Sequence, residues 1–267
     1  MKVKIAAKLE RSSDSYKGEN GRVLVIGGSM DYTGAPALSA NAALRTGSDL
    51  VKIYCPEAVA DIIAGYSENF IVERYSSDYL DLNAARAAME LSEWADSIVL
   101  GPGLGEVDQK PVREILNHAK APLVVDADAL EYVPRSSVKD AVLTPHSGEM
   151  KELMEGIQNL NIMLNRNIAV VEKGSTDKVH TSEKTRKFDV GCPAMTVGGT
   201  GDSLAGIAAS LLSQDLDIDE AAELAAKING KAGELAAEEK GNGMLATDLI
   251  EKIPEIIRTS NSFSSPT

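Results

Sequence analysis

The chain has 267 residues, a length that suits one large α/β domain or two small domains. Its 40 acidic and 27 basic side chains give a formal charge of -13, which argues against DNA or RNA as a partner but not against a locally bound phosphate. With 43% hydrophobic and 25% charged residues, the composition is that of a globular protein rather than a membrane or disordered one.

Two further observations concern the cellular compartment. The first eight residues contain too short an apolar run for a signal peptide, and no later stretch reaches the length of a membrane span. Cys55 and Cys192 show no CxxC or other metal-binding spacing, which is typical of two reduced thiols. We therefore expect a cytoplasmic protein.

Strands and helices alternate in the first half of the chain. The β-branched run 22–26 ends on glycines and predicts a buried strand, and the spacing of Ala and Leu predicts a helix over 35–46. Further strands are expected at 49–54, 97–100 and 122–126, and further helices at 82–95 and 109–120. This alternation predicts a largely parallel sheet with helices on both faces.

The second half adds strands at 141–143 and 168–172, and a hairpin of antiparallel strands within 177–190. Ala-rich helices are expected over 202–212, 220–238 and 247–257. We treat residues 1–258 as a single domain. The Ser/Asn-rich segment 259–267 is expected to be a disordered tail.

A glycine-rich segment directly precedes the helix expected at 202–212: Gly198-Gly199-Thr200-Gly201-Asp202. Glycines allow consecutive backbone N–H groups to turn toward one anion, and a helix N-terminus adds partial positive charge there. Asp202 then lies beside a bound phosphate, where its carboxylate can accept a proton from an attacking hydroxyl. The alternative interpretation makes Asp202 a helix cap and the glycines a turn.

Four strand ends carry residues that a nucleotide enzyme needs, and in open α/β sheets ligands gather at this edge. Glycines follow the strand at 97–100 and allow close approach of a ligand. The next strand ends on Asp126 and Asp128, which can orient a hydroxyl, hold a hydrated Mg²⁺ or cap the next helix; capping is the preferred role for Asp128. His146 and Glu149 follow residue 143, and Glu149 can face a metal or a phosphate through water. Lys173 follows residue 172 and suits a base, ribose or phosphate.

Six motifs occur along the chain in a fixed order. They are Gly21-Arg22-Val23-Leu24-Val25-Ile26-Gly27-Gly28-Ser29, Tyr32-Thr33-Gly34-Ala35-Pro36, Gly101-Pro102-Gly103-Leu104-Gly105, Asp126-Ala127-Asp128-Ala129-Leu130, Leu143-Thr144-Pro145-His146-Ser147-Gly148-Glu149 and Gly198-Gly199-Thr200-Gly201-Asp202. Each motif alone is weak, but the ordered set is specific. From Lys17 onward the chain resembles the NAD(P)H-hydrate dehydratases, a branch of the ribokinase-like superfamily.

The resemblance implies a ribokinase-like three-layer α/β sandwich that repairs hydrated NADH or NADPH. ADP or ATP, with Mg²⁺, phosphorylates the ring hydroxyl with Asp202 as base, and the phosphate is then eliminated. Motif matching assigns two sets of contacts. The hydrated dinucleotide is expected to contact Ala35, Gly103, Gly105, His146 and Asp202. The adenine nucleotide is expected to contact Lys173, Gly174, Ser175, Thr176, Asp177, Gly199, Thr200 and Gly201.

The chain departs from the family pattern at two places. Ser147 stands where the family usually has proline, which loosens the turn after His146. The residues that follow Gly174 match the family more loosely, which leaves the choice between ADP and ATP open. The preference between the hydrates of NADH and NADPH is open as well.

Two other functions compete with dehydration. A vitamin-precursor kinase of the same superfamily fits the segments 32–36 and 144–146 less well than a dehydratase does. A nucleotide-binding sensor without turnover would bind ATP or ADP and would be unaffected by Asp202→Asn. The resemblance also implies a homo-oligomer, and a separate hydrate epimerase, because this chain has no room for the epimerase domain that is fused to some family members.

Overall fold

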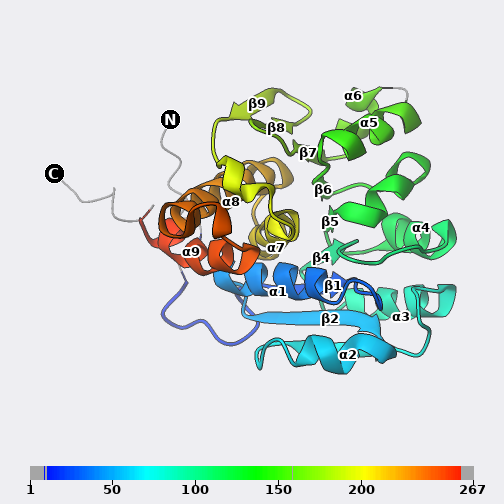
Figure 1. Cartoon of the computed structure of the whole chain (residues 1–267). Helices are drawn as coiled ribbons and strands as arrows, with labels where there is room; N and C mark the ends of the chain where they lie inside the picture. The colour runs from blue at the N-terminus through cyan, green and yellow to red at the C-terminus, as the bar shows by residue number, and fades with distance from the viewer. Residues whose placement is uncertain (1–8, 10, 158, 260–267) are drawn as a thin grey trace.

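The computed structural model describes residues 9, 11–157 and 159–259, and these form a mostly parallel sheet covered by helices on both faces (Figure 1). The strands are β1 (Arg22–Ile26), β2 (Leu50–Pro56), β3 (Ile71–Tyr75), β4 (Ser97–Leu100), β5 (Leu123–Val125), β6 (Ala141–Leu143), β7 (Ile168–Glu172), β8 (Asp177–His180) and β9 (Thr185–Phe188). Their order is β3-β2-β1-β4-β5-β6-β7-β8-β9. The pairs from β3 to β7 are parallel, and β8 and β9 add antiparallel pairs at one edge.

Helices connect the strands. The α-helices are α1 (Gly34–Thr46), α2 (Glu57–Ala64), α3 (Leu82–Ser92), α4 (Gln109–His118), α5 (Ser147–Gly156), α6 (Leu160–Leu164), α7 (Thr200–Ser213), α8 (Ile218–Lys240) and α9 (Ala246–Thr259). The described residues also form the 3₁₀ segments η2 (Ala127–Arg135), η3 (Pro193–Thr196) and η4 (Gly241–Gly243). Within the described ranges, no helix is both long and apolar enough to cross a membrane.

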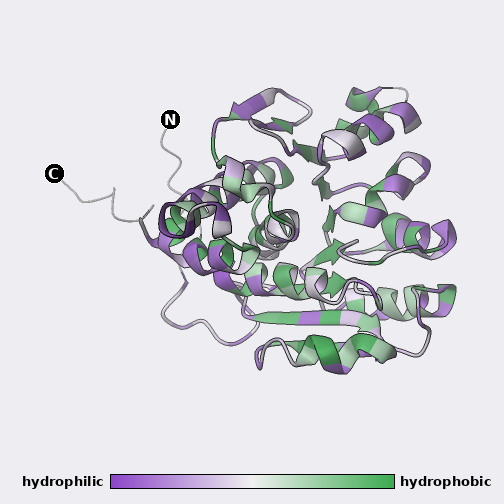
Figure 2. Cartoon of the chain, in the orientation of Figure 1, coloured by the Kyte–Doolittle hydropathy of each residue, from purple (hydrophilic) through white to green (hydrophobic). Residues whose placement is uncertain are grey.

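Two hydrophobic cores, one on each face of the sheet, hold the three layers together. Alternate residues of the strands point to opposite faces, so Val25 belongs to the core that includes residues of α1, α2, α7, α8 and α9, while Ile26 belongs to the core that includes residues of α3, α4, η2, α5 and α6. Hydrophobic residues therefore concentrate on the strands and on the inner faces of the helices, and polar residues face outward (Figure 2). Ala-rich α1, α7 and α8 pack closely, as the low aromatic content of 4% predicts.

The structure contains each strand and helix predicted from the sequence, with ends shifted by a few residues, and the hairpin is antiparallel. The sequence pattern did not predict α2, β3, α5 and α6. Residues 1–8, in which no signal peptide is expected, lie outside the described residues. So does the expected tail, apart from residue 259, which ends α9.

The carboxyl ends of the parallel strands meet at one edge, and glycines bring their loops close together there. The N–H of Gly28 donates to the Pro102 carbonyl at 3.0 Å, which joins the loop after β1 to the loop after β4. A Cβ on Gly101 would lie 1.8 Å from the Asp126 carbonyl oxygen, so only glycine fits between β4 and β5. The chain reverses its direction of winding between β1 and β4, which is where ligands bind in such sheets.

Candidate active site

Asp202 lies in the first turn of α7, behind a helix start that has no side-chain cap. Gly199 occupies the N-cap position with φ of +95°, a left-handed conformation that favours glycine. The first backbone N–H groups of α7 have no partner within the helix and carry its partial positive charge. The alternative that Asp202 caps the helix is wrong, because the cap is Gly199. The segment thus has the geometry of an anion cradle next to a carboxylate.

The Asp202 carboxyl group has an unusual affinity for protons. Burial raises its pKa to about 7, the negative charges of Asp126 and Asp128 raise it as well, and Lys173 opposes them. A carboxylate with a pKa near neutrality is suited to general base catalysis at physiological pH. The backbone of Asp202 is fixed by Ser39 of α1, whose hydroxyl donates to the Asp202 carbonyl at 3.0 Å.

Lys173, directly after β7, is the cation that opposes the rise in the pKa of this carboxyl group. Its ammonium donates to Asp126 Oδ1 at 2.9 Å, and Asp126 is almost fully buried. Burial alone lowers the pKa of Lys173, but the carboxylates of Asp126, Glu149 and Asp202 outweigh it and raise the pKa, so this lysine stays charged. Sequence reasoning noted Asp126 but did not predict its pairing with Lys173.

A cavity of about 710 Å³ opens beside the start of α7 and is large enough for a mononucleotide. Of the residues predicted to bind the nucleotide or substrate, it is lined by His146, Lys173, Gly174, Ser175, Asp177, Thr200 and Gly201. Thr176 and Gly199 do not line it. The Thr200 hydroxyl is engaged with the carbonyls of Met195 (2.9 Å) and Val197 (3.3 Å), so its contribution to binding is limited to the backbone.

The apolar wall of this cavity was not predicted from the sequence. Its residues come from the segment after β9 and from α7 and α8: Val190, Gly191, Cys192, Pro193, Met195, Thr196, Val197, Leu204, Asn229 and Gly230. The sequence feature that could have indicated this wall is the glycine pair Gly230 and Gly233 on α8. A Cβ on Gly230 would lie 2.5 Å from Val190 Cγ2, and a Cβ on Gly233 would lie 2.2 Å from Met195 Sδ. Cys192 is a free thiol in this wall, and Cys55 is a free thiol in the core.

The residues expected to contact the dinucleotide are divided between two places: Gly103 lies close to Ala35, whereas His146 lines the nucleotide cavity. Gly103 packs so closely on the loop before α1 that an added Cβ would lie 2.8 Å from Tyr32 Cβ and 3.2 Å from Ala35 Cβ. Gly105 donates its N–H to Asp128 Oδ2 at 2.8 Å. The expectation that Asp128 caps the following helix is therefore wrong: the N-cap of η2 is Asp126, and Asp128 holds the glycine loop instead.

His146 and Glu149 form a capping box at the start of α5. His146 Nδ1 accepts the N–H groups of Gly148 (3.0 Å) and Glu149 (3.2 Å), and the Glu149 carboxylate accepts the His146 N–H at 2.7 Å. These bonds order the turn after His146 with serine at position 147. His146 thus has a structural role and also lines the nucleotide cavity.

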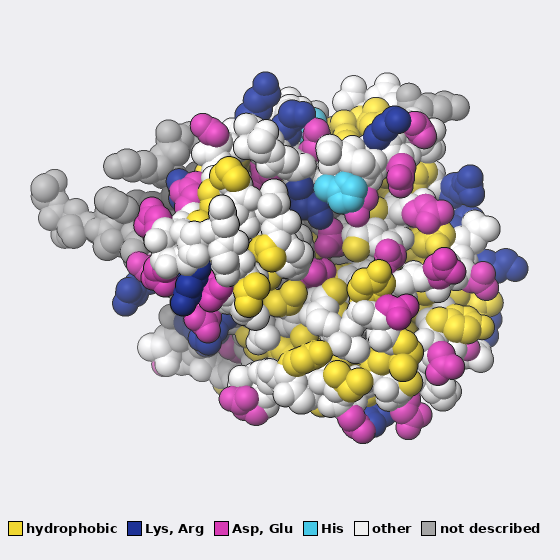
Figure 3. Space-filling view, viewed as in Figure 1, with side chains coloured by type: hydrophobic (Ala, Val, Ile, Leu, Met, Phe, Trp, Pro, Cys, Tyr) yellow, Lys and Arg dark blue, Asp and Glu magenta, His cyan; other side chains and the backbone are white. Residues whose placement is uncertain are grey.

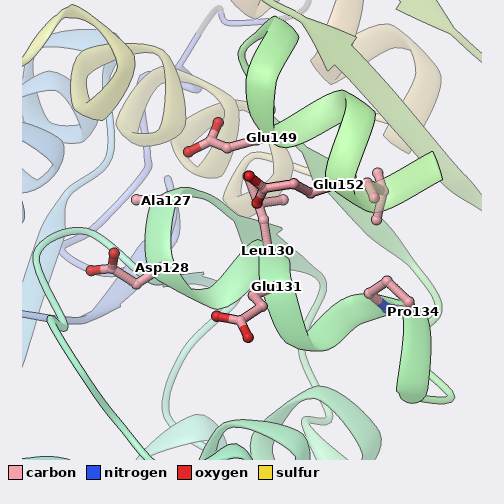
Figure 4. Close-up of a pocket in the computed structure, with 8 residues that line it drawn as sticks. Ala127, Asp128, Leu130, Glu131, Pro134, Glu149 and Glu152 are labelled. Carbon is pink, nitrogen blue, oxygen red and sulfur yellow. The ribbon is translucent and has the colours of Figure 1, made fainter. Parts of the chain in front are cut away.

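Glu149 also lines a smaller acidic pocket of about 220 Å³ between η2 and α5 (Figure 4). Asp128, Glu131 and Glu152 lie around the same pocket. In the described part of the chain, no group of three or more His, Cys, Asp or Glu has the arrangement of a metal site. Mg²⁺ typically binds through nucleotide phosphates and water with only one or two protein carboxylates. A single carboxylate such as Glu149 fits this mode of binding.

The sequence model of the NAD(P)H-hydrate dehydratase family matches residues 23–255. The chain belongs to this family. The ribokinase-like fold is also confirmed: a ribokinase-like superfamily protein from Enterococcus faecalis superposes with a TM-score of 0.83 at 24% identity, covering 97% of this chain and 95% of the other. The family and fold predicted from the six motifs are therefore correct.

Two relatives within the family cover nearly the whole chain. The ADP-dependent (S)-NAD(P)H-hydrate dehydratase of Natrialba magadii is 44% identical over 251 residues, which are 94% of this chain and 97% of the relative. The ADP/ATP-dependent NAD(P)H-hydrate dehydratase of Bacillus subtilis, co-crystallised with ATP and Mg²⁺, is 26% identical, with a TM-score of 0.80 and coverage of 96% of both chains. These similarities extend over the strand-end motifs as well as the core.

Proposed function

We propose that the protein dehydrates hydrated NADH or NADPH with ADP or ATP as phosphate donor. The observation that carries this proposal is the position of Asp202: a partly buried carboxylate with a pKa of about 7, in the first turn of an uncapped helix and beside the Lys173 ammonium. The names of the Natrialba magadii and Bacillus subtilis relatives support the same reaction.

The chemistry follows from the poor leaving ability of hydroxide. Asp202 takes the proton of the ring hydroxyl while the oxygen attacks the terminal phosphorus, which breaks the phosphoanhydride bond and releases AMP from ADP or ADP from ATP. The lone pair of the ring nitrogen then expels phosphate. Loss of a proton from the neighbouring ring carbon restores the double bond of reduced nicotinamide.

The residues around Asp202 are assigned to two ligands, the nucleotide and the hydrated dinucleotide. We assign the nucleotide to the cavity lined by Lys173, Gly174, Ser175, Asp177 and Gly201. The same nucleotide site is also assigned the backbone groups of Thr176, Gly199 and Thr200. The hydrated dinucleotide is assigned to the side of Ala35, Gly103, Gly105 and His146. Mg²⁺ carried by the phosphates neutralises their charge, with Glu149 contributing through water.

The wider setting is proposed on the same grounds. Residues 1–258 act as one domain, and the protein works in the cytoplasm. A homo-oligomer is proposed because the resemblance implies one. Acidic side chains outnumber basic ones across the middle and right of the face in Figure 3, which suits a small-molecule enzyme without a nucleic-acid partner. Because the Natrialba magadii relative is named for the (S) hydrate, an epimerase is expected to convert the other epimer.

The test follows the absorbance band of reduced nicotinamide, which the hydrated form lacks. Purified protein is mixed with hydrated NADH or NADPH, Mg²⁺ and either ADP or ATP, beside Asp202→Asn. The band should return only with nucleotide and only with Asp202, and the faster nucleotide identifies the donor. Nucleotide binding without recovery of the band would reject dehydration; phosphorylation of a small alcohol would then indicate a kinase, and its absence a sensor.

A further inference from the structure

One hydrogen-bonded chain links the ends of three neighbouring strands beside Asp202. The Thr144 hydroxyl, after β6, donates to Asp126 Oδ1 at 2.7 Å. The Lys173 ammonium, after β7, donates to the same oxygen at 2.9 Å. Asp126 itself follows β5, so β5, β6 and β7 each contribute one member. Thr144 is fully buried and the Asp126 side chain is only 3% exposed, so water does not compete for these bonds.

The backbone of Lys173 is fixed by the same strands. Its N–H donates to the Pro145 carbonyl at 2.9 Å, and an isolated parallel bridge pairs Lys173 with His146. A long lysine side chain ordinarily samples many rotamers, and fixing it in one geometry requires such contacts. Lys173 is thus held at its backbone by the loop after β6 and at its ammonium by Asp126.

The held ammonium lies against the first turn of α7. A Cβ on Gly201 would lie only 3.1 Å from Lys173 Nζ, so the ammonium occupies the space that a side chain at position 201 would take. The unpaired N–H groups of the same helical turn provide the rest of an anion site. A phosphoryl group bound there meets a full positive charge from one side and the helix N-terminus from the other.

We propose that Asp126, supported by the Thr144 hydroxyl, is a positioning residue that holds the Lys173 ammonium on the phosphoryl group transferred at the start of α7. This inference rests on the proposed function and deepens it, because it assigns Lys173 to the transferred phosphate rather than to the adenosine part of the nucleotide. Asp126 acts only through Lys173 and does not touch the substrate.

The alternative is a buried ion pair that only stabilises the fold, and two features separate the alternatives. A purely structural pair needs no open side, but Lys173 lines the nucleotide cavity and its side chain is 22% exposed. A structural pair would also leave nucleotide selectivity unchanged when it is broken. The distinction is therefore measurable in binding as well as in turnover.

Binding of ADP and AMP provides the first test, because ADP carries the phosphoryl group that AMP lacks. Loss of a charge-assisted contact to that group should weaken ADP binding by ~10-fold and AMP binding much less, so Asp126→Asn should reduce the preference for ADP. Isothermal titration calorimetry measures both constants without turnover. Equal weakening of ADP and AMP, or no weakening of either, would overturn the assignment.

Thr144 offers a milder pair of variants that keeps the test informative should Asp126→Asn fold poorly. Thr144→Val removes the hydroxyl that supports Asp126, and Thr144→Ser retains it. We expect Thr144→Val to reduce the ADP preference in the same direction as Asp126→Asn, and Thr144→Ser to restore it. Similar behaviour of the valine and serine variants would contradict the hydrogen-bonded chain.

A double-mutant cycle tests whether Asp126 acts through Lys173. Lys173→Gln and the double variant Asp126→Asn/Lys173→Gln should have the same ADP preference, because the acceptor has no remaining role once the ammonium is gone. Additive losses would show an independent role for Asp126. Glu223→Gln is the matched control, since it breaks an ion pair with Arg186 away from this site and should leave ADP preference unchanged.

Turnover adds a readout that fold stability alone does not affect. The charged groups that influence the pKa of Asp202 are Asp126, Asp128 and Lys173. Asp126→Asn should therefore shift the acid limb of the kcat/KM profile to lower pH, and Lys173→Gln should shift it to higher pH. Unshifted pH profiles in active variants would reject the positioning role of Asp126 but not the proposed function. Failure of the parent protein to dehydrate the hydrate would reject the proposed function, and the ADP and AMP binding tests would then decide whether Asp126 positions Lys173.

Discussion

Replacing Asp202 with asparagine should stabilise the folded protein at alkaline pH while it abolishes turnover. Burial raises the pKa of Asp202 to about 7 in the folded protein, whereas a solvated aspartate titrates near ~3.9. Between these two values the folded state retains a proton that the unfolded state has lost. The free energy of unfolding therefore falls as pH rises through this range and levels off above the folded-state pKa. Asparagine cannot ionise and does not undergo this loss.

The size of the effect follows from the difference in pKa. A shift of ~3 units corresponds to ~4 kcal/mol as an upper limit, because one unit is 1.36 kcal/mol. Part of this loss of unfolding free energy is already present at pH 5.5, because Asp202 of the unfolded chain is ionised at that pH. We expect the advantage of Asp202→Asn over the parent to grow by ~2 kcal/mol between pH 5.5 and pH 8.

Urea denaturation at several pH values measures this difference directly. The exposed residue Asp78 provides the control, since Asp78→Asn should follow the parent at every pH. An advantage of Asp202→Asn that is constant with pH would refute the reasoning. It would mean that the Asp202 carboxyl group is not protonated up to neutral pH, and the argument for a base adapted to that pH would lose its physical basis.

Three other predictions follow from the same geometry. The kcat/KM of the parent should fall ~10-fold per pH unit below the Asp202 pKa of about 7, and stopped-flow absorbance in a series of buffers measures it. Gly206→Ala, whose Cβ would lie 2.1 Å from the Ser39 carbonyl oxygen, should lower the free energy of unfolding in urea by ~1–3 kcal/mol, whereas Gly243→Ala, with no atom within 4 Å, should change it little. Tyr132→Phe removes the hydroxyl that donates at 2.8 Å to the loop after β4, and should raise the KM for the hydrated dinucleotide more than the KM for ADP in steady-state assays.

The buried strands and long helices were predictable because their residue patterns are local. After Arg22, the residues of β1 up to Ile26 are all apolar, as a strand covered on both faces must be. β3 (Ile71–Tyr75) was missed because it is an edge strand with Glu73 and Arg74 in its centre and a half-exposed surface. α5 was missed because its start lies within the motif that also suggested a turn around His146.

The site was predictable only up to the pairing of its residues. The glycines and acids at the strand ends show that a ligand edge exists, but Asp126 and Lys173 are 47 positions apart and nothing local joins them. Their contact depends on β5, β6 and β7 lying side by side in that order. Asp128 was assigned to a helix cap for a similar reason: its partner, the N–H of Gly105, lies 23 positions earlier.

The concentration of carboxylates around one lysine explains how an acidic chain can hold anionic ligands and still contain a base that works near neutral pH. Asp126, Glu149 and Asp202 all face Lys173 and keep it charged, so the ammonium is available to a phosphate despite its burial. Burial, together with the negative charges of Asp126 and Asp128, in turn raises the pKa of Asp202. Binding of phosphate at the start of α7 adds further negative charge, which raises that pKa again, so the ionised carboxylate becomes a stronger base while a smaller fraction of the protein carries it at neutral pH.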